Sequence, residues 1–145
     1  MPILQAERTT LNFGMTITDL TGNTMQIDIP LAQGGKGQGM RPMQTLLAAL
    51  CGCSAVDVIS ILQKQKQLLN GFKIFVDGEL EDDKEPSVWK TVDLKFELQG
   101  NIDASKAYRA VKLSIEKYCS VAETLRRAGA EIKFKVMLND TLIDE

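Results

Sequence analysis

Apolar and polar residues alternate at two places in the first thirty positions, as they do in half-buried strands. The apolar members of these two runs are Phe13, Met15 and Ile17, then Met25, Ile27 and Ile29. A turn signal at residues 19–23 (DLTGN) separates the runs, and residues 3–10 form a weaker strand pattern before them. The alternation predicts a three-stranded antiparallel meander.

A long apolar segment follows and predicts a helix. Pro42 suits the first helical position, where its missing N–H leaves no hydrogen bond unmade, and we expect the helix to reach about Leu69, before Gly71. Apolar side chains occupy almost every face of this helix, so every face must be buried. Two copies of the helix packed together, each backed by a sheet, would bury them. The pattern therefore predicts a homodimer, and the alternative is a monomer whose two sheets wrap the helix.

The rest of the chain continues with alternating strands and amphipathic helices. Two alternating runs within residues 72–98 are joined by the charged turn EDDKEPS, and a last run occupies residues 132–138. Between them, Asp103 can cap a helix with an apolar stripe over residues 104–115, and a short helix follows. The order βββ-α-ββ-αα-β predicts the α+β class in a single domain, residues 1–145.

Composition and charge exclude several classes of function. The chain has 145 residues and a net charge of −2, which gives no support to a general binder of nucleic acids or anionic membranes. Glu7 and Arg8 interrupt any signal-peptide core. The longest uncharged run, residues 42–56, is shorter than the roughly 20 residues that span a bilayer. We expect a cytoplasmic protein with no nucleic-acid or membrane partner.

The chain contains no histidine, so Ser-His-Asp and Cys-His arrangements and His-ligated metals are excluded. Its three cysteines lack the C-x-x-C spacing and the fourth ligand of a typical zinc site, and we expect no metal and no cofactor. Residues 34–39 (GGKGQG) match neither the P-loop nor the dinucleotide-binding pattern. This loop is expected to be a flexible connection, or a lid over a nearby pocket.

The long helix carries two thiols, Cys51 and Cys53, and a carboxylate, Asp57, which are candidates for chemistry. Asp57 follows Cys53 by four residues, so both lie on one face of the helix. A carboxylate on an apolar face is costly unless it is paired, so Asp57 implies a polar pocket, a cation or a bonded backbone group, or it turns away into a structural contact. Asp57 would raise the pKa of a neighbouring thiol, so it alone cannot activate Cys53. Packing remains the alternative reading for Cys51 and Cys53, because helical cysteines are common core residues.

The third cysteine precedes a well-marked short helix. Ser120 and Glu123 match the S-x-x-E capping box, which places Cys119 just before the helix N-terminus. The N–H groups and the helix dipole there favour a thiolate. The alternative is that Cys119 only seals the junction of two helices.

Two segments together resemble the OsmC/Ohr family, the osmotically inducible and organic-hydroperoxide-resistance proteins. The segment PMQTLLAALCGCSAVDVISILQK is similar to the central helix of that family, in which a reactive cysteine lies eleven residues after a proline, as Cys53 does after Pro42. The segment EKYCSVAETL is similar to the second cysteine motif of the family. The resemblance implies an OsmC-like intertwined homodimer, with antiparallel sheets from both chains wrapped around two long central helices.

The resemblance also implies a thiol peroxidase. Cys53 would be oxidised by an organic hydroperoxide or hydrogen peroxide to a sulfenic acid, and Cys119 would resolve it to a disulfide. An external dithiol, from a dihydrolipoyl or thioredoxin-like protein, would reduce the disulfide. Cys51 has no counterpart in the usual motif and is read as an extra core thiol. The alternative is a non-catalytic dimeric stress-response or small-molecule-binding protein with the same fold.

One departure from the organic-hydroperoxide branch concerns thiol activation. That branch uses an arginine from the N-terminal strands, held by a glutamate directly after the helix-opening proline. Here Met43 occupies the glutamate position, and Arg8 lies in a different local context. Arg41 is a candidate substitute, but it lies about 18 Å along the helix from Cys53 and could act only across a dimer. The chain therefore resembles most the general OsmC-like branch.

Overall fold

The structure is a computed structural model that describes residues 2–144. The chain divides into two compact units, one within Met1–Ala48 and the other within Ala49–Glu145. Helix α1, Pro42–Lys64, begins in the first unit and continues in the second. The expectation of a single domain over residues 1–145 stays a prediction.

The first unit contains a three-stranded antiparallel sheet in the order β1-β2-β3. The strands are β1 (Leu4–Arg8), β2 (Met15–Asp19) and β3 (Thr24–Ile27), and the 3-10 helix η1 (Leu31–Gln33) follows them. Asp19 fixes the turn after β2, because its carboxylate accepts hydrogen bonds from Asn23 and from the N–H of Thr21. The predicted meander is confirmed.

The glycine-rich loop after η1 is held in place by a buried carboxylate. Asp28 accepts the N–H of Ile29 at 2.7 Å, that of Lys36 at 3.3 Å and that of Gln38 at 3.2 Å. These bonds lower the pKa of Asp28. The loop at residues 34–39 is therefore fastened at two of its backbone N–H groups, and a lid function for it stays a prediction.

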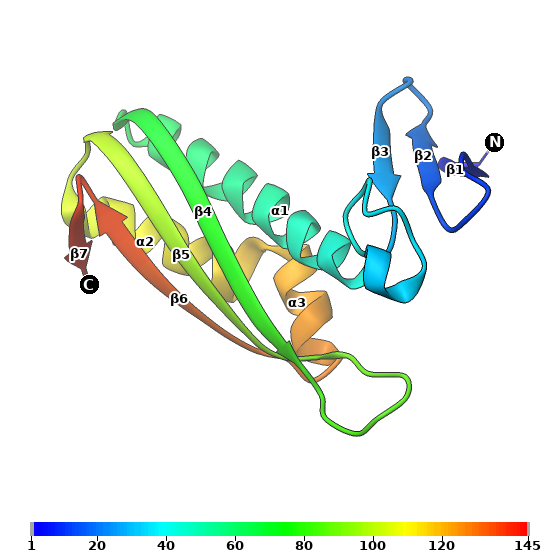
Figure 1. The fold of residues 1–145 in the computed structure, drawn as a ribbon. Helices are drawn as coiled ribbons and strands as arrows, with labels where there is room; N and C mark the ends of the chain where they lie inside the picture. The colour runs from blue at the N-terminus through cyan, green and yellow to red at the C-terminus, as the bar shows by residue number, and fades with distance from the viewer. Residues whose placement is uncertain (1, 145) are drawn as a thin grey trace. The chain divides into compact units, whose positions relative to one another are not determined.

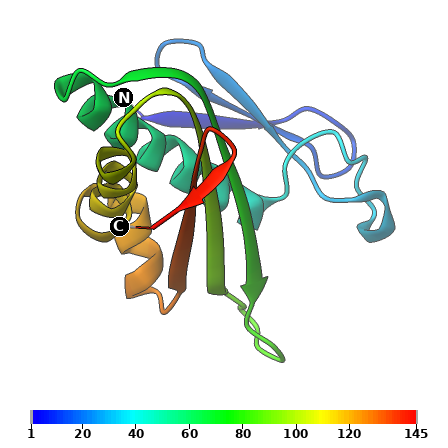
Figure 2. The same cartoon turned by 90° about the vertical axis from the view of Figure 1, so that its left-hand side faces the viewer.

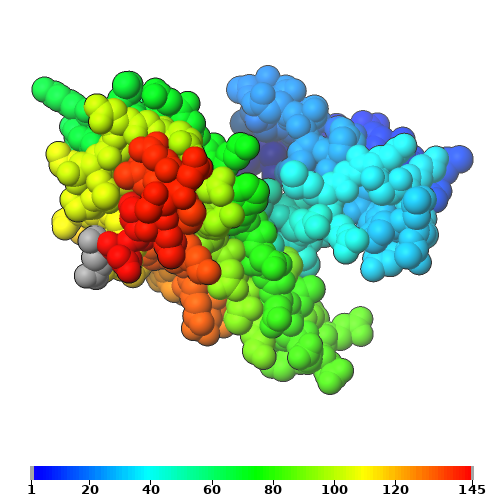
Figure 3. Space-filling model, turned by 60° about the vertical axis from the view of Figure 1, so that its left-hand side comes forward, coloured from blue at the N-terminus to red at the C-terminus, as the bar shows by residue number. Residues whose placement is uncertain are grey.

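The second unit is a four-stranded sheet with its helices on one face (Figures 1 and 2). Its strands, in the order β4-β5-β6-β7, are β4 (Leu68–Leu80), β5 (Trp89–Asn101), β6 (Glu131–Leu138) and β7 (Thr141–Ile143). Strand β7 lies at the surface, in red in Figure 3. The α+β class is confirmed.

One pair in this sheet is parallel. Strands β4 and β5 are antiparallel, as are β6 and β7, but β5 and β6 run in the same direction. A parallel pair needs a long crossover, and three helical segments supply it: α2 (Ala104–Leu113), the π-helix η2 (Ser114–Tyr118) and α3 (Ser120–Arg127). The sequence pattern predicted these segments but not the parallel pairing that they produce.

The core of the second unit lies between the sheet and the helices. Buried positions recur at every second residue on β5 and at every third or fourth residue on the helices, as the two geometries require. They include Val92, Phe96 and Leu98 on β5, Leu50, Ser54, Val58 and Leu62 on α1, and Ala107, Ala110 and Val111 on α2.

Helix α1 ends five residues earlier than predicted. Lys66 has a φ of 55°, and the N–H groups of Lys66 and Gln67 donate back to the carbonyls of Gln63 and Leu62 at 3.0 and 2.9 Å. This is a Schellman end, at which glycine is the usual residue. Because a lysine occupies the position, the sequence carried no stop signal, and the prediction that the helix reaches Leu69 was wrong.

Outside its buried stripe, α1 exposes large apolar side chains. Val56 is 66 % exposed and Ile59 is 38 % exposed. By length and composition alone this helix could cross a membrane, since an 18-residue window has a mean hydropathy of 2.0. From the sequence, we excluded a membrane span because the uncharged run of residues 42–56 is too short. This reason does not hold for the whole helix, which is longer. One such helix is weak evidence for a span, because core helices meet the same criterion.

Candidate functional site

Cys53 and Cys119 come together in the second unit from segments far apart in the sequence. Cys53 lies on α1 and is half-buried, whereas Cys119 lies between η2 and α3 and is 2 % exposed. The Cys53 thiol lies close enough to Cys119 to shift the pKa of the Cys119 thiol, and both cysteines are free. The fold thus places in contact the two cysteines that the family resemblance singled out.

Cys119 itself caps helix α3. Its backbone is extended, with φ −73° and ψ 107°, and its sulfur accepts the N–H of Ala122 at 3.4 Å. Ser120, the predicted cap, is instead the first residue of the helix. The predicted capping box was therefore wrong, and Glu123 pairs with arginines of the last turn, Arg126 and Arg127.

The surroundings of Cys119 raise its pKa to about 11. Burial is the largest cause, because it disfavours the charged thiolate. Cys53 contributes through the hydrogen bond with the Cys119 thiol and through repulsion between two thiolates, while the N–H of Ala122 acts in the opposite direction. The expectation that the helix N-terminus would make Cys119 a thiolate was wrong, since desolvation outweighs the helix end.

Asp57 has a partner on the crossover helices. The Ser114 hydroxyl donates to Asp57 Oδ2 at 2.9 Å, and the carbonyl of Ser54 lies 3.3 Å from the same hydroxyl. Ser114 is fully buried, and Asp57 is partly buried. The bond from Ser114 gives Asp57 a structural contact. Sequence analysis missed Ser114, whose only signal was a polar residue beside the apolar stripe of the helix that starts at residue 104.

Two grooves open beside this site, and Asp57 lines one of them. A groove of about 620 Å³ is lined by Asp57, Ile61, Lys64, Leu113 and Tyr118, among others. A smaller groove of about 330 Å³ reaches Cys119 and also has Tyr118 in its wall. Asp57 thus accepts a hydrogen bond from Ser114 and also belongs to the wall of a groove, and a pocket role for it stays a prediction.

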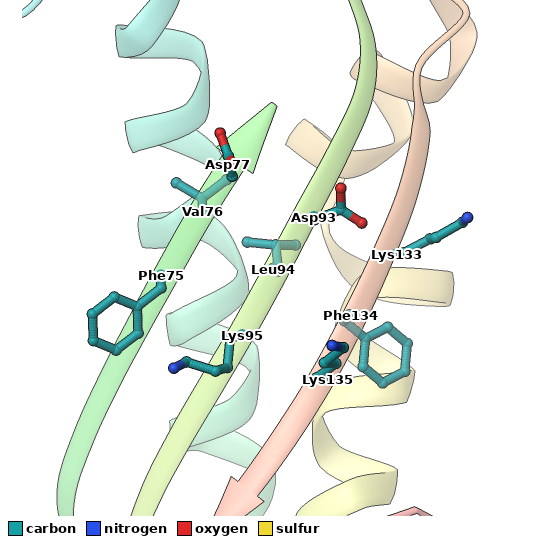
Figure 4. A pocket seen from close by; sticks show the side chains of 9 residues that line it. All are labelled: Phe75, Val76, Asp77, Asp93, Leu94, Lys95, Lys133, Phe134 and Lys135. Carbon is teal, nitrogen blue, oxygen red and sulfur yellow. The ribbon is translucent and has the colours of Figure 1, made fainter. Parts of the chain in front are cut away.

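A third groove, of about 450 Å³, lies on the open face of the sheet and does not belong to the thiol site. Phe75, Lys95 and Lys135 project from this face, with the helices behind the strands (Figure 4). Lys95 Nζ lies 4.7 Å from the centre of the Phe75 ring and also pairs with Glu97 at 3.1 Å. The thiols lie on the helical side of the sheet.

The remaining candidates lie elsewhere. Cys51 is half-buried on α1, and burial raises its pKa. Arg41 belongs to the first unit, where its backbone N–H donates to Gln44 Oε1 at 3.1 Å and closes the start of α1. Arg8, in the same unit, donates from its guanidinium to the carbonyls of Leu11 and Asn12. An activating role for Arg41 stays a prediction.

The cysteines and carboxylates of the chain form no evident metal-binding cluster among the described residues. Within residues 2–144, no group of three or more cysteine, aspartate or glutamate side chains is arranged to hold a metal ion. Paired thiols in general can be oxidised to a sulfenic acid and can condense to a disulfide.

Comparison with known proteins places the chain in a family. The profile of OsmC-like proteins matches residues 35–135. Protein YhfA of Escherichia coli K12 is 36 % identical over 117 residues, which cover 79 % of this chain and 84 % of YhfA. A hypothetical protein of Aquifex aeolicus VF5 is 27 % identical, with a TM-score of 0.76 over 96 % of this chain and 99 % of the other.

A solved structure with a similar fold is that of an organic hydroperoxide resistance protein OsmC from Legionella pneumophila. It is 19 % identical, with a TM-score of 0.69 over 94 % of this chain and 96 % of the other. The profile match includes both cysteine-bearing segments, α1 with Cys53 and the η2–α3 junction with Cys119. The chain belongs to the OsmC-like protein family.

Proposed function

We propose that the protein is a cysteine-based peroxidase with a redox stress-response role, acting on organic hydroperoxides or hydrogen peroxide. The observation that carries the proposal is the contact between the Cys53 thiol and the buried thiol of Cys119. A Cys119 pKa of about 11 keeps that thiol protonated at neutral pH. Cys53, the more exposed of the two, is therefore assigned as the nucleophile.

The first step consumes the hydroperoxide. The Cys53 thiolate attacks the terminal oxygen of the hydroperoxide, the O–O bond breaks, and the alkoxide leaves as an alcohol after it takes up a proton. The sulfur is oxidised to a sulfenic acid, and the peroxide is reduced by two electrons. With hydrogen peroxide the leaving group is water.

The second step uses Cys119. Its sulfur attacks the Cys53 sulfenic acid, an S–S bond forms, and the sulfenic oxygen leaves as water with the Cys119 proton. An external dithiol, from a dihydrolipoyl or thioredoxin-like protein, then attacks the disulfide. We assign Cys53 as the attacked sulfur, because Cys119 is 2 % exposed. The dithiol is oxidised and the protein returns to two thiols.

The proposed protein is an intertwined homodimer in the cytoplasm. The exposed apolar residues of α1, Val56 and Ile59 among them, support a partner helix, because patches of this kind mark association surfaces. Free thiols are typical of a reducing compartment. The proposed partners are thus a second copy, the hydroperoxide and the dithiol.

The proposal is tested by turnover. Purified protein is mixed with tert-butyl hydroperoxide, or with hydrogen peroxide, and dihydrolipoamide as the dithiol. We expect measurable but slow peroxide consumption, abolished by Cys53→Ser and reduced in multiple turnover by Cys119→Ser. A folded wild type that consumes neither peroxide with dihydrolipoamide or reduced thioredoxin would overturn the proposal.

The second candidate is a small-molecule-binding protein without turnover, and one observation favours it. In residues 49–144, the arginine hydrogen bonds and ion pairs run to Glu123 and to the carbonyl of Ile115, rather than to Cys53. Reactive thiols usually lie beside a cation or a helix N-terminus, which favours the thiolate. The groove of about 620 Å³ beside Asp57 would then be the binding site.

A further inference from the structure

Ser114 connects the two cysteine-bearing segments through both its side chain and its main chain. Its hydroxyl donates to Asp57 Oδ2 at 2.9 Å, and Asp57 lies one helical turn after Cys53 on α1. Its carbonyl accepts the N–H of Cys119 at 2.8 Å. A short path of hydrogen bonds therefore runs from the helix of Cys53 to the backbone of Cys119.

The main-chain part of this path depends on the π-helix η2. The bond from the Cys119 N–H to the Ser114 carbonyl spans five residues, as in a π-turn, a feature that is often found at functional sites. The next carbonyl, that of Ile115, accepts from Arg126 Nη1 at 2.8 Å. Hydrogen bonds thus hold two carbonyls of the turn, and they help to fix the backbone direction at Cys119.

The side-chain part fixes η2 against α1. Ser114 is fully buried, and a buried hydroxyl or carboxylate is costly unless it is hydrogen-bonded. Both acceptors of the Ser114 hydroxyl, Asp57 Oδ2 at 2.9 Å and the carbonyl of Ser54 at 3.3 Å, belong to α1. A hydrogen bond requires a narrow range of length and angle. These bonds therefore help to set where Cys119 lies relative to Cys53.

We propose that Ser114 is a positioning residue for the disulfide step, and the proposal rests on the proposed peroxidase function. Ser114 touches neither reacting sulfur. It holds Cys119 where the condensation of Cys53 sulfenic acid with the Cys119 thiol, which yields a disulfide and water, needs little movement. Bridged cysteines require Cα atoms about 4.4–6.8 Å apart, so a small displacement slows the step.

The first experiment measures the disulfide without any hydroperoxide. Protein is equilibrated with glutathione buffers, in which oxidised glutathione and the protein dithiol give the protein disulfide and two reduced glutathione molecules. We expect Ser114→Ala to lower the equilibrium constant about 10-fold or more, since effective concentration depends steeply on placement. Ser54→Ala is the matched control, because Ser54 is equally buried but its hydroxyl bonds only within α1.

Variants at Asp57 keep the proposal testable if Ser114→Ala does not fold. Asp57→Ala should lower the equilibrium constant by less than Ser114→Ala does, because the Ser114 hydroxyl can still donate to the carbonyl of Ser54. Asp57→Asn should keep most of the wild-type equilibrium constant, because the amide oxygen still accepts from Ser114. The proposal is overturned if Ser114→Ala or Asp57→Ala matches the wild type. It is also overturned if Ser54→Ala loses as much, because the effect would then be general destabilisation.

The second experiment separates this role from the peroxidase function. With tert-butyl hydroperoxide, Ser114→Ala should form the Cys53 sulfenic acid at the wild-type rate but convert it to the disulfide more slowly, with more sulfinic acid by mass spectrometry. An equal slowing of both steps contradicts a positioning role. A wild type that never forms the sulfenic acid overturns the peroxidase proposal, while the glutathione equilibrium still decides the role of Ser114.

Discussion

The Cys53 thiol, in the middle of helix α1, lies beside the Cys119 thiol, at the N-cap of α3, and helps to raise the pKa of Cys119. One partner is half-buried and the other is almost fully buried. The pair is therefore unequal in access, and burial together with Cys53 raises the pKa of Cys119. This inequality gives the two thiols different expected reactivities.

Stability should depend on pH through Cys119. Its pKa is raised from 9.0 to about 11, so the contribution is fully present below pH 9 and is lost as the pH rises toward 11, where the unfolded thiol ionises before the folded one. Under reducing conditions, the free energy of unfolding in urea should fall more steeply between pH 9 and 11 for the wild type than for Cys119→Ala. Parallel curves for the two proteins would contradict the raised pKa.

The exposed face of α1 should hold a dimer together. Val56 is 66 % exposed in the single chain, and a glutamate there would place a charge in the proposed helix–helix contact. We expect sedimentation at micromolar concentration to show a dimer for the wild type and for Val56→Leu, and dissociation for Val56→Glu. A folded wild-type monomer would rule out the proposed assembly.

The end of α1 offers a stabilising substitution. Lys66 adopts a φ of 55°, which costs a side-chain-bearing residue about 1 kcal/mol and suits glycine. Lys66→Gly should raise the free energy of unfolding by up to about 1 kcal/mol. Lys64→Gly, two residues earlier and inside the helix, is the matched control and should lower it by about the same amount. Equal effects of the two substitutions would argue against the Schellman end.

Arg41 can be tested without disturbing the helix start. The cap of α1 uses the backbone N–H of Arg41, so Arg41→Met keeps the bond to Gln44 and removes only the guanidinium. If Arg41 activates Cys53 across a dimer, this change should slow sulfenic acid formation, because it removes the cation that favours the thiolate. An unchanged rate would mark Arg41 as a surface group.

Sequence patterns predicted the elements whose physics is local. The N-terminal meander follows from alternation and a turn signal, and the start of α1 follows from Pro42. The end of α1 was missed because Lys66 adopts a conformation for which lysine gives no signal. The parallel pairing of β5 and β6 was missed because it depends on how the crossover helices return the chain to the sheet.

In the candidate site, too, the features that depend on local sequence were predicted, and those that depend on tertiary contacts were not. Cys53 and Cys119 were identified by their motifs, and the fold brings them together. The helix N-terminus led us to expect a lowered pKa for Cys119. The pKa is raised instead, because the thiol is buried, and burial cannot be read from the local sequence. Ser114 could not be identified, since its partner, Asp57, lies on another helix and the π-turn has no sequence signature.

The most direct measurement treats the reduced protein with one equivalent of tert-butyl hydroperoxide and maps the disulfide by peptide mass spectrometry. The peroxidase account predicts a link between Cys53 and Cys119 within one chain, with Cys51 still a free thiol. A disulfide that involves Cys51, or Cys53 oxidised to the sulfinic acid with Cys119 untouched, would contradict it.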